Sequence, residues 1–217
     1  DLHLSIRRQR QMCIRDSYTI VGASLLWVGW FGFNAGSAYG ANEGAGMAML
    51  VTQIATAASA LSWMVIEWFT KGKPTVIGLT GGAVAGLVAI TPASGFVYPM
   101  GALVIGLVAG AACWFFSTVV KKALGYDDSY DVFGIHGVGG IVGALLTGLF
   151  CVPILADVEP GMEQLGIQFY GILMTIGWCG FATFVILKAI DMTIGLRVSS
   201  KVEQEGLDVN LHGEIVD

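Results

Sequence analysis

Six long apolar stretches constrain most strongly how this chain can fold. They cover residues 18–37, 45–69, 75–90, 99–120, 132–153 and 166–190 of a chain of 217 residues. A helix needs about 20 mainly apolar residues to cross the hydrocarbon core of a bilayer. Only 12% of the residues are charged, whereas soluble domains usually carry about a quarter. The stretches therefore predict an all-α, polytopic membrane helix bundle with six transmembrane helices within residues 18–197.

Basic residues are confined to one side of these predicted helices. If successive stretches cross the membrane in alternation, one side receives Arg7, Arg8, Arg10, Arg15, Lys71, Lys73, Lys121, Lys122, Arg197 and Lys201. The opposite connections, 38–44, 91–98 and 154–165, contain neither lysine nor arginine. By the positive-inside rule, both ends of this chain are predicted to be cytoplasmic, in a cell membrane. No basic face remains for nucleic acid.

The two ends differ from the apolar region. Residues 1–17 form a polar, arginine-rich segment without the continuous apolar run of a signal peptide. They are either a cytoplasmic lead-in or sequence foreign to the domain, and we assign them no structure. Residues 198–217 form a polar tail, predicted to lie in the cytoplasm.

The stretch 132–150 contains one ionisable side chain, His136, among many glycines. Glycine weakens a helix by up to about 1 kcal/mol relative to alanine. In a membrane it lets helices approach closely, and Gly139 and Gly143 have the small-xxx-small spacing that does so. His136 has two possible roles. It can hydrogen-bond across a helix interface as a structural contact, or it can carry function, which is the default hypothesis for an ionisable group at membrane depth.

A second informative stretch, WVGWFGFNAGS (residues 27–37), lies at the outer half of the first predicted helix. Its aromatic residues are explained equally well as an interfacial belt or as a binding site. The binding hypothesis rests on Phe33 and Ser37, which are four residues apart and so share a helix face. An aromatic ring attracts cations and a hydroxyl oxygen accepts hydrogen bonds. Together they suit a small cation with N–H donors.

Several residues are interpreted first as structural. Asp131 is predicted to cap the fifth helix and Pro74 to occupy the first turn of the third. Glu67 and Asp191, near the inner helix ends, are expected to reach the interface or to cap neighbouring groups, with a direct functional role as the alternative. The four cysteines share no metal-ligand spacing, and three of them are interpreted as buried apolar residues. We expect neither a metal nor a cofactor. No serine nucleophile motif accompanies His136, so an enzyme is not expected.

Five motifs, in order along the chain, resemble the ammonium transporter family. They are GWFGFNAGSA (29–38), ANEGAG (41–46), GLTGGAVAGLVAITPASG (78–95), DDSYDVFGIHGVGGIVG (127–143) and GLRVSSKVEQEGLDVNLHGE (195–214). The resemblance covers about residues 18–217 and corresponds to helices six to eleven of such a transporter plus its cytoplasmic tail. It implies an inverted-repeat fold, with this sequence as an incomplete part of it.

The resemblance also implies roles for four residues. Phe33 resembles a phenylalanine that gates the pore, Ser37 a serine that contacts the ion, and Trp30 a pore-lining tryptophan. His136 resembles one of two histidines that share a hydrogen bond midway along the pore. The implied function is nitrogen uptake by a transporter or channel that recruits ammonium, removes its proton and passes ammonia. The family further implies a homotrimer and a PII-class signalling partner at the cytoplasmic face. The alternative function is an ammonium sensor with the same fold.

Overall fold

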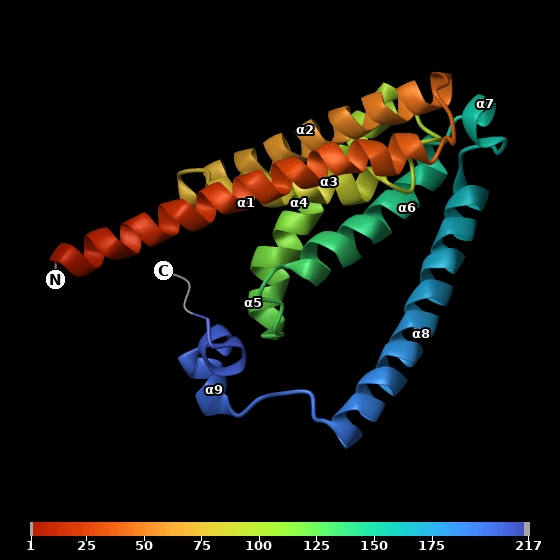
Figure 1. Ribbon diagram of the computed structural model, residues 1–217. Coiled ribbons are helices and arrows are strands. Elements are labelled where there is room, and N and C mark those ends of the chain that lie inside the picture. Colours follow the sequence, from red (N-terminus) through yellow and green to blue (C-terminus); the bar gives the residue numbers. More distant parts are fainter. Residues whose placement is uncertain (1, 215–217) are drawn as a thin grey trace. The chain divides into compact units, whose positions relative to one another are not determined.

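The computed structural model describes residues 2–214, and these residues form helices joined by short connections (Figure 1). Within this range the only extended pairing is an isolated antiparallel bridge between Val97 and Cys151. The chain divides into two compact units, Asp1–Ile172 and Leu173–Asp217. The predicted all-α membrane bundle is confirmed.

The first helix, α1 (Leu2–Gly36), is longer than the predicted segment 18–37. It includes residues 2–17, for which no structure was predicted from the sequence. The reason is local. Residues 2–17 contain no glycine or proline, and their leucines, arginines and glutamines are good helix formers.

Side-chain caps define the next two helices. α2 (Glu43–Lys71) begins where the Asn42 side chain accepts a hydrogen bond of 2.9 Å from the Ala45 N–H. It ends at Gly72, whose φ of +78° is the left-handed conformation that glycine adopts without strain. α3 (Val76–Ile90) is capped by Thr75, whose Oγ1 accepts from the Gly78 N–H at 2.9 Å. Pro74 therefore precedes the cap. The prediction that Pro74 occupies the first turn of this helix is wrong.

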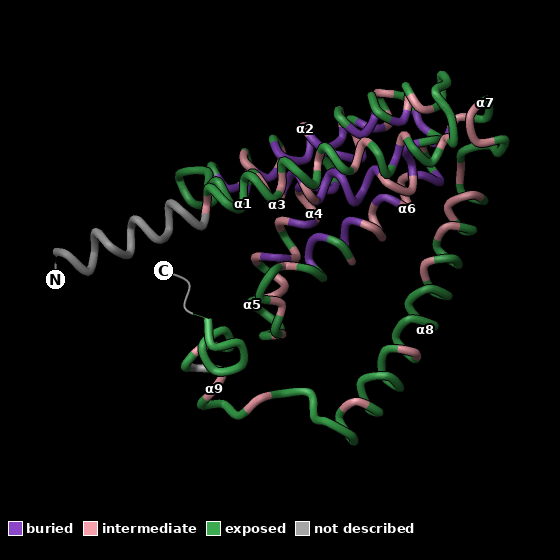
Figure 2. Tube along the Cα trace, viewed as in Figure 1, coloured by how far each residue is buried: buried purple, intermediate pink, exposed green. Residues whose placement is uncertain are grey.

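The core of the first unit lies where α2 packs against α3 and α4 (Pro99–Phe115). Figure 2 shows the buried residues concentrated along these helices. Val51 and Ala55 of α2, Ile90 of α3 and Ile105 of α4 are fully buried in one cluster. Alanine and glycine at most remaining contacts keep the helices close, as is typical of membrane bundles.

Two π-helical turns interrupt the next helices. α4 continues into η1 (Phe116–Val120) and α5 (Lys121–Leu124), and the following span begins with η2 (Phe133–Gly137) before α6 (Val138–Phe150). α6 packs against α3 and α4. A Cβ atom at Gly143 would collide with the Ala89 carbonyl oxygen of α3. The predicted close approach at Gly143 is confirmed.

The predicted cap of this span is wrong. The backbone N–H groups of Phe133 and Gly134 both donate to Asp128 Oδ2 at 3.1 Å, so Asp128 supplies the capping carboxylate. Asp131 instead has a φ of +55°, and its carboxylate accepts a hydrogen bond from Lys121. Sequence proximity favoured Asp131, but the left-handed turn directs its side chain to another partner.

The remaining helices are α7 (Pro153–Ala156), α8 (Met162–Thr193), α9 (Ser200–Glu205) and η3 (Asp208–His212). α8 contains no buried residue, so Cys179 is exposed. Cys113 and Cys151 are buried and free, as predicted, whereas the prediction that Cys179 is a buried apolar residue is wrong. Asp191 does not cap a backbone group in the described residues but lies 3.7 Å from Lys188.

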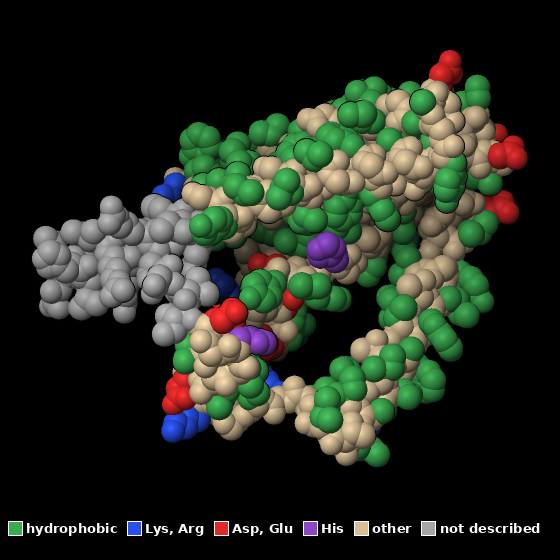
Figure 3. Space-filling model, viewed as in Figure 1, with side chains coloured by type: hydrophobic (Ala, Val, Ile, Leu, Met, Phe, Trp, Pro, Cys, Tyr) green, Lys and Arg blue, Asp and Glu red, His purple; other side chains and the backbone are tan. Residues whose placement is uncertain are grey.

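Four described helical segments are long and apolar enough to cross a membrane. They are Glu43–Lys71, Pro99–Leu124, Phe133–Phe150 and Met162–Thr193. α3 is apolar but shorter. α1 is not among the four segments, and its apolar part contains glycine, tryptophan and asparagine, which lower its mean hydropathy. On the face shown in Figure 3, hydrophobic side chains cover most of the first unit, and acidic side chains gather near α7 and the α1–α2 connection. The chain is an integral membrane protein.

Candidate functional site

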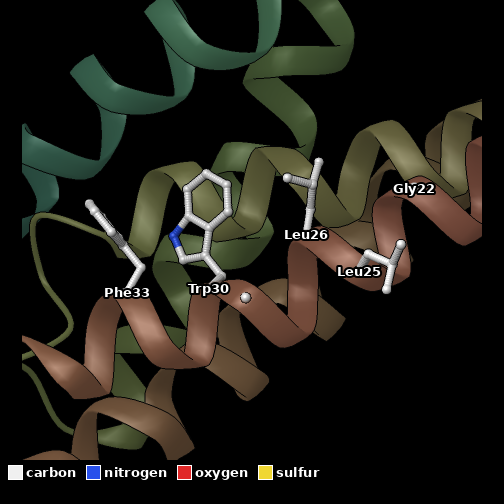
Figure 4. A pocket seen from close by; sticks show the side chains of 6 residues that line it. Gly22, Leu25, Leu26, Trp30 and Phe33 are labelled. Carbon is white, nitrogen blue, oxygen red and sulfur yellow. The ribbon is translucent and has the colours of Figure 1, made fainter.

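An apolar groove along α1 contains two of the predicted site residues. It has a volume of about 540 Å³ and is lined by Gly22, Leu25, Leu26, Gly29, Trp30 and Phe33. Figure 4 shows the Leu26, Trp30 and Phe33 side chains projecting from the same side of the helix. The rings of Trp30 and Phe33 are 6.1 Å apart and inclined by 69°, an edge-to-face arrangement. The helical spacing of these residues therefore produces a continuous aromatic surface.

Trp30 is held in place by Thr91, which was not predicted as a site residue. Its Nε1–H donates a hydrogen bond of 2.7 Å to Thr91 Oγ1, at the end of α3. The Thr91 hydroxyl in turn donates to the Leu87 carbonyl at 2.7 Å. Each partner thus fixes the next, and the indole plane is oriented by α3 as well as by α1. A threonine in an apolar helix end is too common for sequence alone to identify it.

Phe33 and Ser37 lie next to each other at the end of α1, as predicted. Phe33 is 62% exposed. The Ser37 Oγ donates a hydrogen bond of 2.8 Å to the Phe33 carbonyl, so its own lone pairs remain able to accept. Between them, Asn34 is buried and donates to Thr52 Oγ1 of α2 at 2.9 Å, which anchors this turn of α1. The ring and the hydroxyl are therefore presented by a turn that is tied to the core.

His136 lines a second cavity of about 540 Å³. The wall of this cavity also includes Leu26 of α1, Trp63, Glu67 and Lys71 of α2, and Asp131. The imidazole is exposed, and within residues 2–214 it makes no hydrogen bond, so both ring nitrogens are free to bind a guest. Among the described residues, His136 therefore makes no hydrogen bond across a helix interface, and both of its predicted roles stay predictions.

Leu26 lines both cavities, so the groove of Trp30 and Phe33 borders the cavity of His136. The structure thus places Trp30 and Phe33 together on α1, with Ser37 directly after the end of this helix. His136 lies in the neighbouring cavity. Both cavities lie within the first unit.

Charged groups line the far wall of the His136 cavity. Glu67 is buried, and its Oε1 accepts a hydrogen bond of 2.6 Å from Lys71 Nζ. Its Oε2 accepts from the Thr75 N–H at 3.0 Å and from Thr75 Oγ1 at 2.8 Å. The prediction that Glu67 caps neighbouring groups is confirmed. Every oxygen of this carboxylate is occupied, which makes Glu67 a structural anchor of the α2–α3 connection. Among the described residues, no cluster of histidine, cysteine and acidic side chains is suited to a metal ion.

These features define a class: a polytopic α-helical membrane protein with an aromatic groove bordering a cavity that contains a single imidazole. Comparisons with known proteins identify the family. Residues 7–216 match the model of the Ammonium Transporter Family. The match includes part of the lead-in 1–17, which the resemblance had left out. The chain belongs to the ammonium transporter family.

Individual relatives agree with this assignment. The chain is 50% identical over 215 residues to an ammonium transporter of Aquifex aeolicus, covering 96% of this chain and 50% of the relative. Among solved structures, Mep2 of Saccharomyces cerevisiae is similar with a TM-score of 0.79 and 37% identity, covering 84% of this chain and 43% of that one. A Sensor Amt Protein is similar with a TM-score of 0.82 and 32% identity, over 88% and 48% of the two chains. The chain thus spans about half the length of the relatives it matches.

Proposed function

We propose that this chain forms part of a transporter that moves ammonium nitrogen across the cell membrane, with Phe33, Ser37, Trp30 and His136 along the route. The observation that supports the proposal is that Leu26 lines both the aromatic groove of α1 and the cavity of His136, so the two cavities are neighbours. Membership of the ammonium transporter family supports the substrate.

Recruitment is assigned to the end of α1. The exposed ring of Phe33 offers a cation–π contact worth about 2 kcal/mol to a desolvated ion. Ser37 Oγ accepts a hydrogen bond from an ammonium N–H while it donates its own proton to the backbone. The same hydroxyl oxygen also attracts potassium, which has a similar size, so discrimination between the two ions is assigned to the next step.

Passage beyond the rings requires loss of the charge. Placing a bare small ion in a medium of low dielectric constant costs on the order of 20 kcal/mol, which a cation–π contact of about 2 kcal/mol does not offset. Ammonium can release a proton and continue as neutral ammonia, whereas potassium cannot. A neutral imidazole has one donor and one acceptor nitrogen. With both nitrogens unpaired, His136 can accept from ammonia, donate to it, or exchange a proton with a second base.

The direction of the route follows from charge. The His136 cavity is bordered by Lys71 and Asp131, at the end of the bundle where the basic residues gather. By the positive-inside rule this end is cytoplasmic and the Phe33 end is outside. We further propose a homotrimer and a cytoplasmic tail that contacts a PII-class protein, as the family resemblance implies.

An ammonium sensor is the second candidate, and the similarity to a Sensor Amt Protein favours it. A sensor binds ammonium without net transfer. Binding alone requires Phe33 and Ser37, whereas transfer also requires His136.

The deciding experiment compares His136→Ala with the unaltered full-length chain in proteoliposomes. We expect His136→Ala to lower methylammonium uptake or to weaken discrimination against potassium, because the imidazole is the one ionisable group of its span. Phe169→Ala, an exposed aromatic residue on α8 outside both cavities, is the control for loss of a ring. Unchanged uptake and unchanged selectivity in His136→Ala would remove this residue from the mechanism.

A further inference from the structure

The start of the π turn that carries His136 is fixed by contacts that the proposed transport route does not use. His136 is the fourth residue of η2, and the preceding connection runs from Gly125 to Val132. Three side chains contact this connection or the first turn of η2. They are Ser117 and Lys121 of the preceding span and Asp128 of the connection itself.

Asp128 caps the turn. Its Oδ2 accepts the backbone N–H groups of both Phe133 and Gly134 at 3.1 Å. Its own carbonyl accepts the Asp131 N–H at 3.1 Å, which closes the preceding turn. A carboxylate bonded to free N–H groups at a helix start is stabilised by charge-assisted bonds and by the helix dipole. The first residue of η2 is therefore specified by one side chain.

Lys121 fastens this cap to the end of the previous span. Its Nζ donates to the Asp128 carbonyl at 2.6 Å and to Asp131 Oδ1 at 2.8 Å. Asp131 has a φ of +55°, a conformation that non-glycine residues adopt at a cost unless neighbouring contacts hold them there. Lys121 supplies that contact. The adjacent Lys122 makes no ion pair within the described residues.

Ser117 sets the distance between the two π turns. A Cβ atom at Gly134 would collide with Ser117 Oγ, so η1 and η2 are in direct contact at this point. Next to this contact, Cys113 Sγ lies 3.7 Å from the Ile135 carbonyl. Gly134 and Ile135, the two residues before His136, are thus both held by the α4–η1 segment.

A π turn contains one more residue than an α-helical turn and is rarely stable without support. If η2 relaxed to an α-helix, the residues that follow it would shift by one position relative to the residues that precede it. One position corresponds to a rotation of about 100° around the helix axis. That rotation would carry the imidazole away from its present direction. The contacts of Asp128 and Lys121 oppose it.

We propose that Asp128 and Lys121 are positioning residues that hold η2 in its π turn and so aim the His136 imidazole into its cavity. The transport consequence of this inference rests on the proposed function, but the geometric consequence does not.

The test uses Lys121→Met and Asp128→Ala in the full-length chain in lipid nanodiscs, with Lys122→Met as the matched control. Cryo-electron microscopy of each variant gives the direction of the imidazole, and melting temperature shows whether the variant is folded. We expect the imidazole to be displaced in both test variants and unmoved in Lys122→Met. Lys121→Arg keeps the charge and should restore the original direction.

Transport is measured in parallel on the same variants. We expect maximal methylammonium uptake to fall about tenfold or more, since small misplacement of a reacting group costs this much. KM should change little, because recruitment at Phe33 and Ser37 is on another helix. A displaced imidazole with normal uptake would uphold the positioning role and overturn the proposed role of His136 in transport. An imidazole that stays in place in folded Lys121→Met and Asp128→Ala would overturn the inference.

Discussion

The indole nitrogen of Trp30 and the hydroxyl of Thr91 are 2.7 Å apart and join α1 to the end of α3. This bond links the aromatic groove to the packed core, because α3 is itself buried against α2 and α4. The groove is therefore a fixed surface and not a set of independent side chains on an exposed helix. Four predictions test the contacts that create it and the bundle behind it.

Replacing Thr91 by valine removes the acceptor without changing the shape of the side chain. We expect a loss of about 1 kcal/mol in stability, the usual net value of one hydrogen bond, together with slower methylammonium uptake as the indole becomes mobile. Thr70→Val is the control, because the Thr70 hydroxyl bonds to Ile66 of its own helix at 2.7 Å. Equal melting temperatures and equal uptake for the two variants would contradict a role for Thr91 in holding Trp30.

Phe33→Ala should weaken recruitment of the cation. Loss of a cation–π contact of about 0.5–2 kcal/mol corresponds to a rise in the KM for methylammonium of about two- to thirtyfold. Phe33→Leu keeps an apolar side chain without the ring and should show the same rise. If Phe33→Leu keeps the original KM, apolar bulk explains the site and cation binding by the ring does not.

Glu67→Gln should destabilise the α2–α3 connection by about 1–2 kcal/mol, since a buried carboxylate that accepts three hydrogen bonds loses its charge. Lys71→Met should cost less, about 0–1 kcal/mol, because the Lys71 side chain is 46% exposed and solvent screens the pair. Melting temperatures in detergent compare the two variants. A larger effect at Lys71 would show that the ion pair, and not the cap at Thr75, stabilises this connection.

Gly143→Ala and Gly140→Ala form a matched pair on α6. An alanine Cβ at residue 143 meets the backbone of Ala89, which is unable to move aside without separating α6 from α3. We expect a loss of about 1–3 kcal/mol, as for other overpacked sites. A Cβ atom at Gly140 would have no atom of a neighbouring helix within 4 Å among the described residues, so alanine should be neutral or stabilise the helix by up to about 1 kcal/mol. Thermal unfolding of both variants checks this, and equal stability would refute the close packing at Gly143.

The sequence by itself determined the class of protein and the approximate positions of the apolar helices, and the roles of Trp30, Phe33, Ser37 and His136 stay predictions. Hydrophobic length and the four-residue spacing of Phe33 and Ser37 are local properties, so they can be recognised without knowing which helices meet. Helix α1 was underestimated because polar residues 2–17 satisfy helix propensity without being apolar.

Tertiary structure decided the rest. The bond from Trp30 to Thr91, the wall that Leu26 shares between two cavities, and the choice of Asp128 over Asp131 as the cap join groups that are distant in the chain or are turned by an unusual φ. The π turn that carries His136 lies where η1 packs against η2, so its surroundings come from a segment that precedes it in the chain. Such features depend on which surfaces become neighbours when the helices pack, and a linear sequence does not specify those neighbours.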